Sequence, residues 1–162
     1  MTTFDCQDLI RTFEQELLAD IPLTRAMHLR VAEWDGDQLR MTAPLMPNIN
    51  DKGCAFGGSL ASLMTLAGWG LIVLKLRALD RPCDIYVQDS TIRYLAPVWA
   101  DFAAEARLAD GESWDAFLRP LDERGRSRLR VVCRVPLTDG GDAVTFEARF
   151  VALVTKVADA AT

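Results

Sequence analysis

The sequence predicts an α+β fold in which one long apolar helix is covered by a curved antiparallel sheet. The first observation behind this prediction is the stretch from Gly57 to Leu74, which contains no charged residue and is apolar on all sides. Such a long run without strand-like alternation favours a helix, and a helix that is apolar all round has to be covered. The second observation is a series of alternating segments after it, each with one apolar face that also needs a cover.

The composition is that of an ordinary globular protein. The chain has 162 residues, half of them hydrophobic and a quarter charged, which suits a single domain over residues 1–162 with a core at about 23–155. A net charge of −5 argues against nucleic acid as a partner. Four cysteines without a CxxC pair, behind a charged N-terminus, indicate reduced thiols in a cytoplasmic protein without a signal peptide. With one histidine and no His/Cys cluster, we expect no metal site and no cofactor.

A helix and a hairpin are expected before the apolar helix. Residues 5–20 carry apolar side chains at helical spacing, and Pro22 is expected to stop this N-terminal helix. The runs 27–34 and 38–43 then flank the pair Asp35-Gly36, which is a hairpin signal.

Four strands are expected after the apolar helix. They cover residues 85–95, 102–108, 126–135 and 144–154, and the connection at 114–121 is expected to be a short helical turn. Clear alternation means an antiparallel sheet with one packed face and one exposed face. Because the apolar helix is the obvious cover for the packed face, the whole order indicates a hotdog fold with an extra N-terminal helix.

A membrane span is the rival interpretation of the apolar helix. Its uncharged run lies at the threshold length for crossing a bilayer. However, four glycines and three hydroxyl residues dilute its hydrophobicity, and the sheet would lose its core without it. We therefore expect no membrane span.

The start of this helix carries the candidate site. A polar loop containing Asn50 leads into the pair Gly57-Gly58, where the helix begins. Paired glycines let a ligand approach the backbone, and a helix N-terminus offers unpaired N–H groups with a partial positive charge. Loop, glycine pair and buried helix together make an oxyanion-binding corner.

The spacing of this corner resembles that of known enzymes. Asn50, then Phe56-Gly57-Gly58, then Thr65 matches the active-site stretch of hotdog acyl-thioesterases, which show Asn, His-Gly-Gly and a helix carboxylate. Together with the segment STIRYLAP at 90–97, the chain resembles the YiiD C-terminal family over about residues 5–155. That family carries a thioesterase label and includes malonyl-ACP decarboxylases. The resemblance implies a homodimer, or a dimer of dimers, that acts on a thioester of acyl carrier protein (ACP) or coenzyme A.

Two departures from the thioesterase pattern favour decarboxylation. Phe56 replaces the histidine and Thr65 replaces the carboxylate. Hydrolysis needs an activated water, yet the only acid within residues 44–79 is Asp51. Loss of CO2 from a malonyl thioester needs mainly stabilisation of the enolate oxygen, which the Asn50 amide and the glycine N–H groups can supply.

Three functions stay open. The preferred one is conversion of malonyl-ACP or malonyl-CoA to the acetyl thioester in the initiation of fatty-acid synthesis. The alternative is an acyl-CoA or acyl-ACP thioesterase. The third is a non-catalytic module that binds acyl thioesters.

Eight residues form the predicted site. The catalytic set is Asn50, Gly57, Gly58 and Thr65, and the substrate-binding set is Phe56, Ser59, Arg126 and Arg128. Structural alternatives exist for each kind: a turn role for the asparagine, tight packing for the glycines and a hydroxyl bonded one turn back for the threonine. The arginines belong to a row that is either a solvated strand face or a docking patch for an acidic carrier or coenzyme phosphates. The competing docking candidates are Lys75, Arg77 and Arg81.

Overall fold

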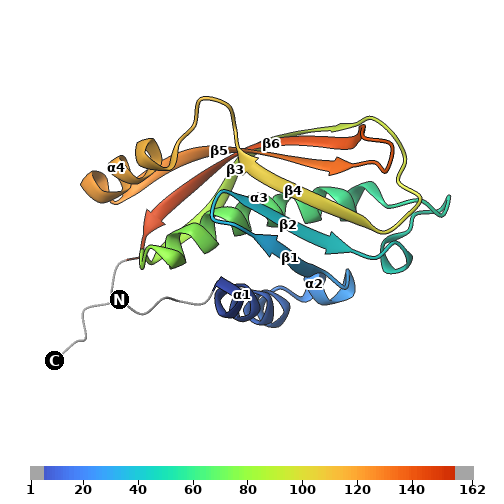
Figure 1. The fold of residues 1–162 in the computed structure, drawn as a ribbon, viewed down its shortest axis with the longest axis horizontal. Helices are drawn as coiled ribbons and strands as arrows, with labels where there is room; N and C mark the ends of the chain where they lie inside the picture. The colour runs from blue at the N-terminus through green and yellow to red at the C-terminus, as the bar shows by residue number, and fades with distance from the viewer. Residues whose placement is uncertain (1–5, 156–162) are drawn as a thin grey trace.

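The computed structural model describes residues 6–155. Six antiparallel strands form one sheet that curves around the long helix α3 (Gly57–Ala78), as Figure 1 shows. The strands lie in the order β1-β2-β4-β5-β6-β3. Their bounds are Arg30–Trp34 (β1), Gln38–Ala43 (β2), Cys83–Tyr94 (β3), Phe102–Leu108 (β4), Arg126–Pro136 (β5) and Asp142–Val154 (β6). The remaining helices are α1 (Cys6–Asp20), α2 (Pro22–Ala26), α4 (Trp114–Arg124) and the 3-10 turn η1 (Met46–Asn48). This arrangement confirms the predicted hotdog fold with an N-terminal helix.

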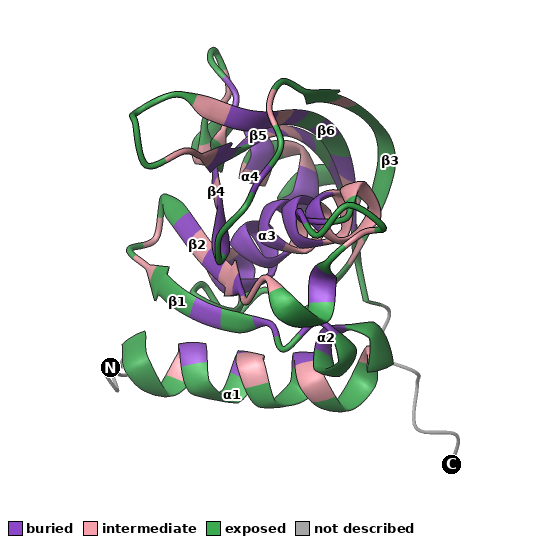
Figure 2. Ribbon diagram, turned by 90° about the vertical axis from the view of Figure 1, so that its right-hand side faces the viewer, coloured by how far each residue is buried: buried purple, intermediate pink, exposed green. Residues whose placement is uncertain are grey.

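Helix α3 is the centre of the hydrophobic core. In Figure 2 it is enclosed by the sheet, with β1 and β2 on one side and β3 on the other, while α1 lies below. By length and composition α3 could cross a membrane, but 61% of its most apolar window is buried inside the fold. Side chains from α1 and β2 reach its backbone at Gly70, where an added Cβ would lie about 3 Å from Phe13, Leu39 and Met41. The helix therefore serves as the packed core of the sheet.

Strand β5 shows how the sequence specifies the two faces of the sheet. Its buried residues alternate with arginines, and its central residues pair with β6 in antiparallel register, for example Val131 with Ala148. Leu129, Val131 and Val135 point into the core, whereas Arg126 and Arg128 lie exposed on the outer face. One face of the sheet thus packs on α3 and the other faces solvent.

Several boundaries differ from the sequence predictions. The hairpin begins at Arg30 because Pro22 opens the short helix α2 instead of only ending α1. Proline suits this first helical position, where its missing N–H is not needed. The turn at 114–121 is a full helix, α4, because Ser113 caps its start and Gly125, in a left-handed conformation, ends it. Strand β3 begins two residues earlier than predicted, at Cys83.

The sheet has open edges at β1 and β3. Helix α1 packs against β1, but most side chains of β3 are exposed or half-buried. The exposed ones include Tyr86 and Val87, at 58% and 46%. A long exposed edge strand with apolar side chains offers unpaired backbone groups for pairing with another strand.

Candidate active site

The loop that leads into α3 is held by hydrogen bonds on both sides. The buried Asn48 side chain donates to the carbonyl oxygens of Met27 (2.9 Å) and Pro44 (2.8 Å). Its own backbone carbonyl accepts from the N–H of Phe56 at 2.7 Å, and the N–H of Ala55 donates to Val98 at 2.8 Å. The two residues immediately before α3 are therefore each fixed to a neighbouring segment.

Asn50 forms a local turn in this loop. Its N–H donates to the carbonyl oxygen of Cys54 at 2.8 Å, and its side-chain oxygen accepts from the N–H of Lys52 at 2.9 Å. Its side-chain nitrogen faces the sulfur of Cys54, at 3.2 Å. The turn role and the donor role are therefore compatible, since the turn uses the oxygen and the amide nitrogen has only a weak acceptor.

Helix α3 begins without a capping side chain. Its N-cap is Phe56, in an extended conformation and without a side-chain cap bond. The first N–H groups of a helix have no partner within the helix, so those of Gly57, Gly58 and Ser59 remain available at this end. They point out of the helix start, where the partial charge is positive. The oxyanion-binding role that the sequence analysis assigns to this helix start stays a prediction.

Two aromatic rings flank the paired glycines. The Phe56 ring covers Gly58 so closely that an added Cβ would lie 2.3 Å from a ring carbon. On the other side, the hydroxyl of Tyr94 donates to the carbonyl oxygen of Gly57 at 3.1 Å. Both rings are about half exposed, at 54% and 55%. The absence of side chains at the glycine pair therefore leaves room for two aromatic rings.

Tyr94 is the site residue that the sequence analysis misses. It lies at the end of β3 and opposite Val144 of β6, whose side chain is buried in the core. Its position in the sequence could have indicated a role, because a tyrosine on the core-facing side of a strand needs a hydrogen-bond partner for its hydroxyl. The identity of that partner, a carbonyl on α3, follows only from the fold.

The hydroxyl of Thr65 donates to the carbonyl oxygen of Ala61, one turn back, at 2.9 Å. Its proton is thus used within the helix, and the oxygen keeps acceptor capacity. Thr65 and Ser59 are both half-buried, and Ser62 makes the same kind of bond to Gly58 at 2.8 Å. Thr65 therefore presents a hydroxyl group at the position where the resemblance to hotdog thioesterases implies a carboxylate.

Comparison with known proteins identifies the family. The family model described as "Putative thioesterase (yiiD_Cterm)", YiiD_C, matches residues 10–154. The chain belongs to the YiiD_C family. This confirms the resemblance seen in the sequence.

Solved structures agree with this assignment. A protein of unknown function from Chlorobaculum tepidum TLS is 27% identical with a TM-score of 0.87, and the match covers 96% of this chain and 100% of that one. A Shewanella oneidensis protein described as a putative thioesterase is 29% identical with a TM-score of 0.81, covering 91% and 99%. A thioesterase from Haemophilus influenzae shares the fold at 13% identity, with a TM-score of 0.70 and coverage of 99% and 97%.

In this YiiD_C chain the predicted docking arginines lie far from the glycine pair. Arg128 of β5 pairs with Val151 of β6, and Val151 pairs in turn with Tyr86 of β3. The glycine pair instead contacts Tyr94, at the other end of β3. Eight residues of strand separate the two tyrosines, which corresponds to roughly 25 Å. One chain by itself does not bring Arg126 or Arg128 to the oxyanion corner.

The other basic side chains are largely paired. Arg130 contacts Glu112 at 2.9 Å and Arg134 contacts Glu105 at 2.8 Å. The competing docking candidates all form ion pairs: Lys75 with Asp37, Arg77 with Glu16 and Arg81 with Asp122. Lys75 also donates to the carbonyl oxygen of Gly36. Within residues 6–155, Arg126 has no ion-pair partner, and Arg128 contacts the uncharged Gln88. These two arginines are therefore the freest cations of the two predicted sets.

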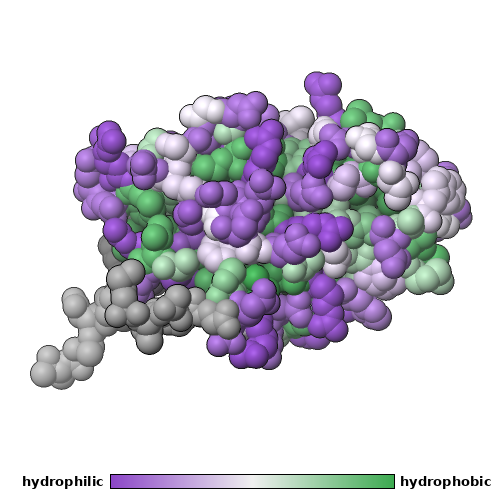
Figure 3. Space-filling model, viewed as in Figure 1, coloured by the Kyte–Doolittle hydropathy of each residue, from purple (hydrophilic) through white to green (hydrophobic). Residues whose placement is uncertain are grey.

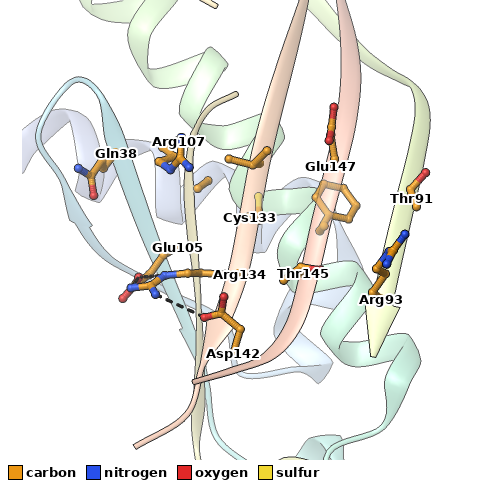
Figure 4. Close-up of a pocket in the computed structure, with 13 residues that line it drawn as sticks. Gln38, Thr91, Arg93, Glu105, Arg107, Cys133, Arg134, Asp142, Thr145 and Glu147 are labelled. Atoms are coloured by element: carbon orange, nitrogen blue, oxygen red, sulfur yellow. Dashed lines mark hydrogen bonds and ion pairs between the residues drawn. The ribbon is translucent and has the colours of Figure 1, made fainter. Parts of the chain in front are cut away.

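The largest hollow described lies on the outer face of the sheet. It measures about 750 Å³, and its wall includes the Arg134 guanidinium between Glu105 and Asp142, as Figure 4 shows. Its cations and carboxylates balance one another. On the face of the molecule seen in Figure 3, polar side chains alternate with apolar patches. The predicted catalytic residues are absent from its lining and from the linings of two hollows of about 450 Å³.

Proposed function

We propose that this YiiD_C protein decarboxylates a malonyl thioester, carried on ACP or coenzyme A, to the acetyl thioester. The observation that carries the proposal is the chemistry at the start of α3: backbone N–H groups that have no partner within the helix, and no side chain at positions 56 and 65 that can act as a general base. The aromatic Phe56 and the back-bonded Thr65 occupy the positions at which a base is expected. Charge stabilisation is therefore the chemistry that this corner can offer.

The one acid near this corner in sequence is poorly placed to activate water. Asp51 lies exposed in the loop, and its carboxylate contacts the ammonium of Lys52 at 3.0 Å. This contact directs the carboxylate of Asp51 at the lysine. Hydrolysis would need a base directed at a water next to the thioester carbon.

Decarboxylation needs no such base. The bond between the α-carbon and the carboxylate breaks, CO2 leaves, and the electron pair moves onto the thioester carbonyl as an enolate. The enolate oxygen is stabilised by the N–H groups of Gly57 and Gly58 and by the Asn50 amide. A proton from water then adds to the α-carbon and gives the acetyl thioester.

We also propose that the working unit is a dimer formed through β3. Antiparallel pairing of two β3 strands would satisfy the open edge and bury its apolar side chains. Because such pairing reverses the second strand, it would bring the Arg126–Arg128 end of a second copy towards the glycine pair of the first. Those arginines would then be available for an acidic carrier or coenzyme phosphates.

Incubation with malonyl-ACP, read by mass spectrometry, tests the reaction. Acetyl-ACP is the expected product. Release of the free ACP thiol would support the thioesterase alternative instead, and an unchanged but retained ligand would support a binding module.

The variant Val87→Lys tests the assembly. Light scattering should show a dimer for the wild type and a monomer for Val87→Lys. A monomeric wild type at micromolar concentration would contradict the proposed dimer.

A further inference from the structure

The hydrogen bond from Tyr94 ends on a peptide group that also belongs to the candidate site. The carbonyl of Gly57 and the N–H of Gly58 are the two ends of one planar peptide unit. Tyr94 donates to the carbonyl end at 3.1 Å, and its ring lies 3.4 Å from the position of a Cβ on Gly57. The other end is one of the N–H groups left unpaired at the start of α3.

A donor at the carbonyl end strengthens the donor at the N–H end. Hydrogen-bonded amides polarise one another along a chain, which strengthens each bond by roughly 10–30%. The carbonyl oxygen has two lone pairs, so it can accept from Tyr94 as well as from the helix backbone. The bond also limits rotation of this peptide, at a helix start that has no capping side chain.

The position of Tyr94 is itself well fixed. It pairs with Val144 in β6, and the N–H groups of the next two residues, Leu95 and Ala96, donate to the carbonyl oxygen of Ala143 at 2.8 and 3.1 Å. The end of β3 is therefore tied to the neighbouring strand. A tyrosine held in this way keeps its hydroxyl directed at the start of α3.

We propose that Tyr94 is a positioning residue that polarises and orients the Gly58 N–H as an oxyanion donor. The inference deepens the proposed function and rests on it. Tyr94 acts through the Gly57–Gly58 peptide and takes no proton from the substrate. Its effect should appear in the strength of the hydrogen bond to the thioester oxygen, more than in substrate affinity.

The test compares Tyr94→Phe with Tyr86→Phe. The first keeps the ring and removes only the hydroxyl, and the second makes the same change on the outer face of the same strand. The main measurement is the infrared stretching frequency of the thioester carbonyl in bound, 13C-labelled acetyl-CoA, a ligand with no carboxyl group to lose. In the wild type this frequency should lie below the solution value, in Tyr94→Phe it should move back towards that value, and in Tyr86→Phe it should stay as in the wild type.

Kinetics with malonyl-ACP and the amide NMR signal of Gly58 add two further readouts. Tyr94→Phe should lower kcat by about threefold to tenfold, the range for one neutral hydrogen bond, with KM nearly unchanged. The Gly58 amide proton should shift upfield in the free variant. Unchanged carbonyl frequency and amide shift in Tyr94→Phe, or equal changes in Tyr86→Phe, would overturn the inference.

The same data separate this inference from the proposed reaction. If the carbonyl frequency responds to Tyr94 but malonyl-ACP yields no acetyl-ACP, then the positioning role holds and the decarboxylase proposal fails. If the carbonyl frequency is not lowered even in the wild type, the thioester does not reach the glycine N–H groups. In that case the positioning role of Tyr94 and the proposed reaction site are both wrong.

Discussion

The side-chain nitrogen of Asn50 lies 3.2 Å from the sulfur of Cys54. A thiol is a weak acceptor, so the amide can exchange this contact for a thioester oxygen at little cost. Meanwhile the side-chain oxygen of Asn50 remains bonded to the N–H of Lys52 and keeps the turn in place. One residue can therefore shape the loop with its oxygen and serve the substrate with its nitrogen.

The Asn50 amide can be tested with an isosteric change. Asn50→Asp keeps an oxygen for the Lys52 N–H and loses the amide donor, whereas Asn50→Ala loses both. Either variant should lower turnover of malonyl-ACP on the order of 100-fold, the cost of one oxyanion donor. Cys54→Ala is the control and should stay near wild-type activity. If Asn50→Ala still made acetyl-ACP at the wild-type rate, the proposed site would be wrong.

A carboxylate at position 65 should oppose the proposed reaction. Thr65→Asp or Thr65→Glu would place a second anion near the developing enolate, and we expect decarboxylation to fall on the order of tenfold or more. Thr65→Val, which removes only the hydroxyl, is the matched control and should have the smaller effect. The products of each variant are read by mass spectrometry, because a new base could also introduce hydrolysis. Faster acetyl-ACP formation in Thr65→Asp would contradict the enolate mechanism.

Gly58 and Phe56 should be energetically coupled. An alanine at Gly58 would place its Cβ 2.3 Å from the Phe56 ring, so the half-exposed ring has to move over the oxyanion corner or away from it. We expect Gly58→Ala to lower kcat/KM more than Phe56→Ala does. In the double variant the two losses should be clearly less than additive, since the clash is absent. If the losses in kcat/KM, expressed as free energies, were strictly additive across the wild type, the two single variants and the double variant, the ring and the glycine would act independently.

The hairpin between β1 and β2 should make stability depend on pH. The N–H groups of Asp37 and Gln38 donate to Asp35, at 2.9 and 2.8 Å, and these bonds lower the pKa of its carboxyl. A pKa that is lower in the folded state gives stability that is present above the unfolded value and is lost as pH falls through the folded value. Wild type should therefore unfold at a higher temperature than Asp35→Asn near pH 7, and the two should converge in acid. A constant difference in Tm at all pH values would contradict this assignment.

The sequence predicts the order of the major elements because each has a strong local pattern. The all-apolar run of α3 and the arginine alternation of β5 are examples. Helix α2 is missed because Pro22 both ends one helix and opens the next, and these two uses look alike in sequence. The length of α4 is missed because the helix runs beyond the predicted turn at 114–121 and ends only at Gly125.

The site is predicted only where it is local in sequence. The glycine pair and the loop before it lie within a few residues of one another, so their spacing alone suggests a candidate site at this helix start. The contact of Tyr94 with Gly57 spans 37 positions and depends on how β3 and α3 meet. The separation of Arg128 from this corner likewise depends on strand register, which alternation alone does not fix.

The hydrogen bonds that hold the loop before α3 bear on the entropy of binding. Asn48 fixes this loop through its side chain, and the N–H groups of Ala55 and Phe56 are bonded to neighbouring segments. The conformational freedom of the loop is therefore lost when the chain folds, before any thioester arrives. Binding of a thioester at this helix start would then have little ordering cost left in this segment.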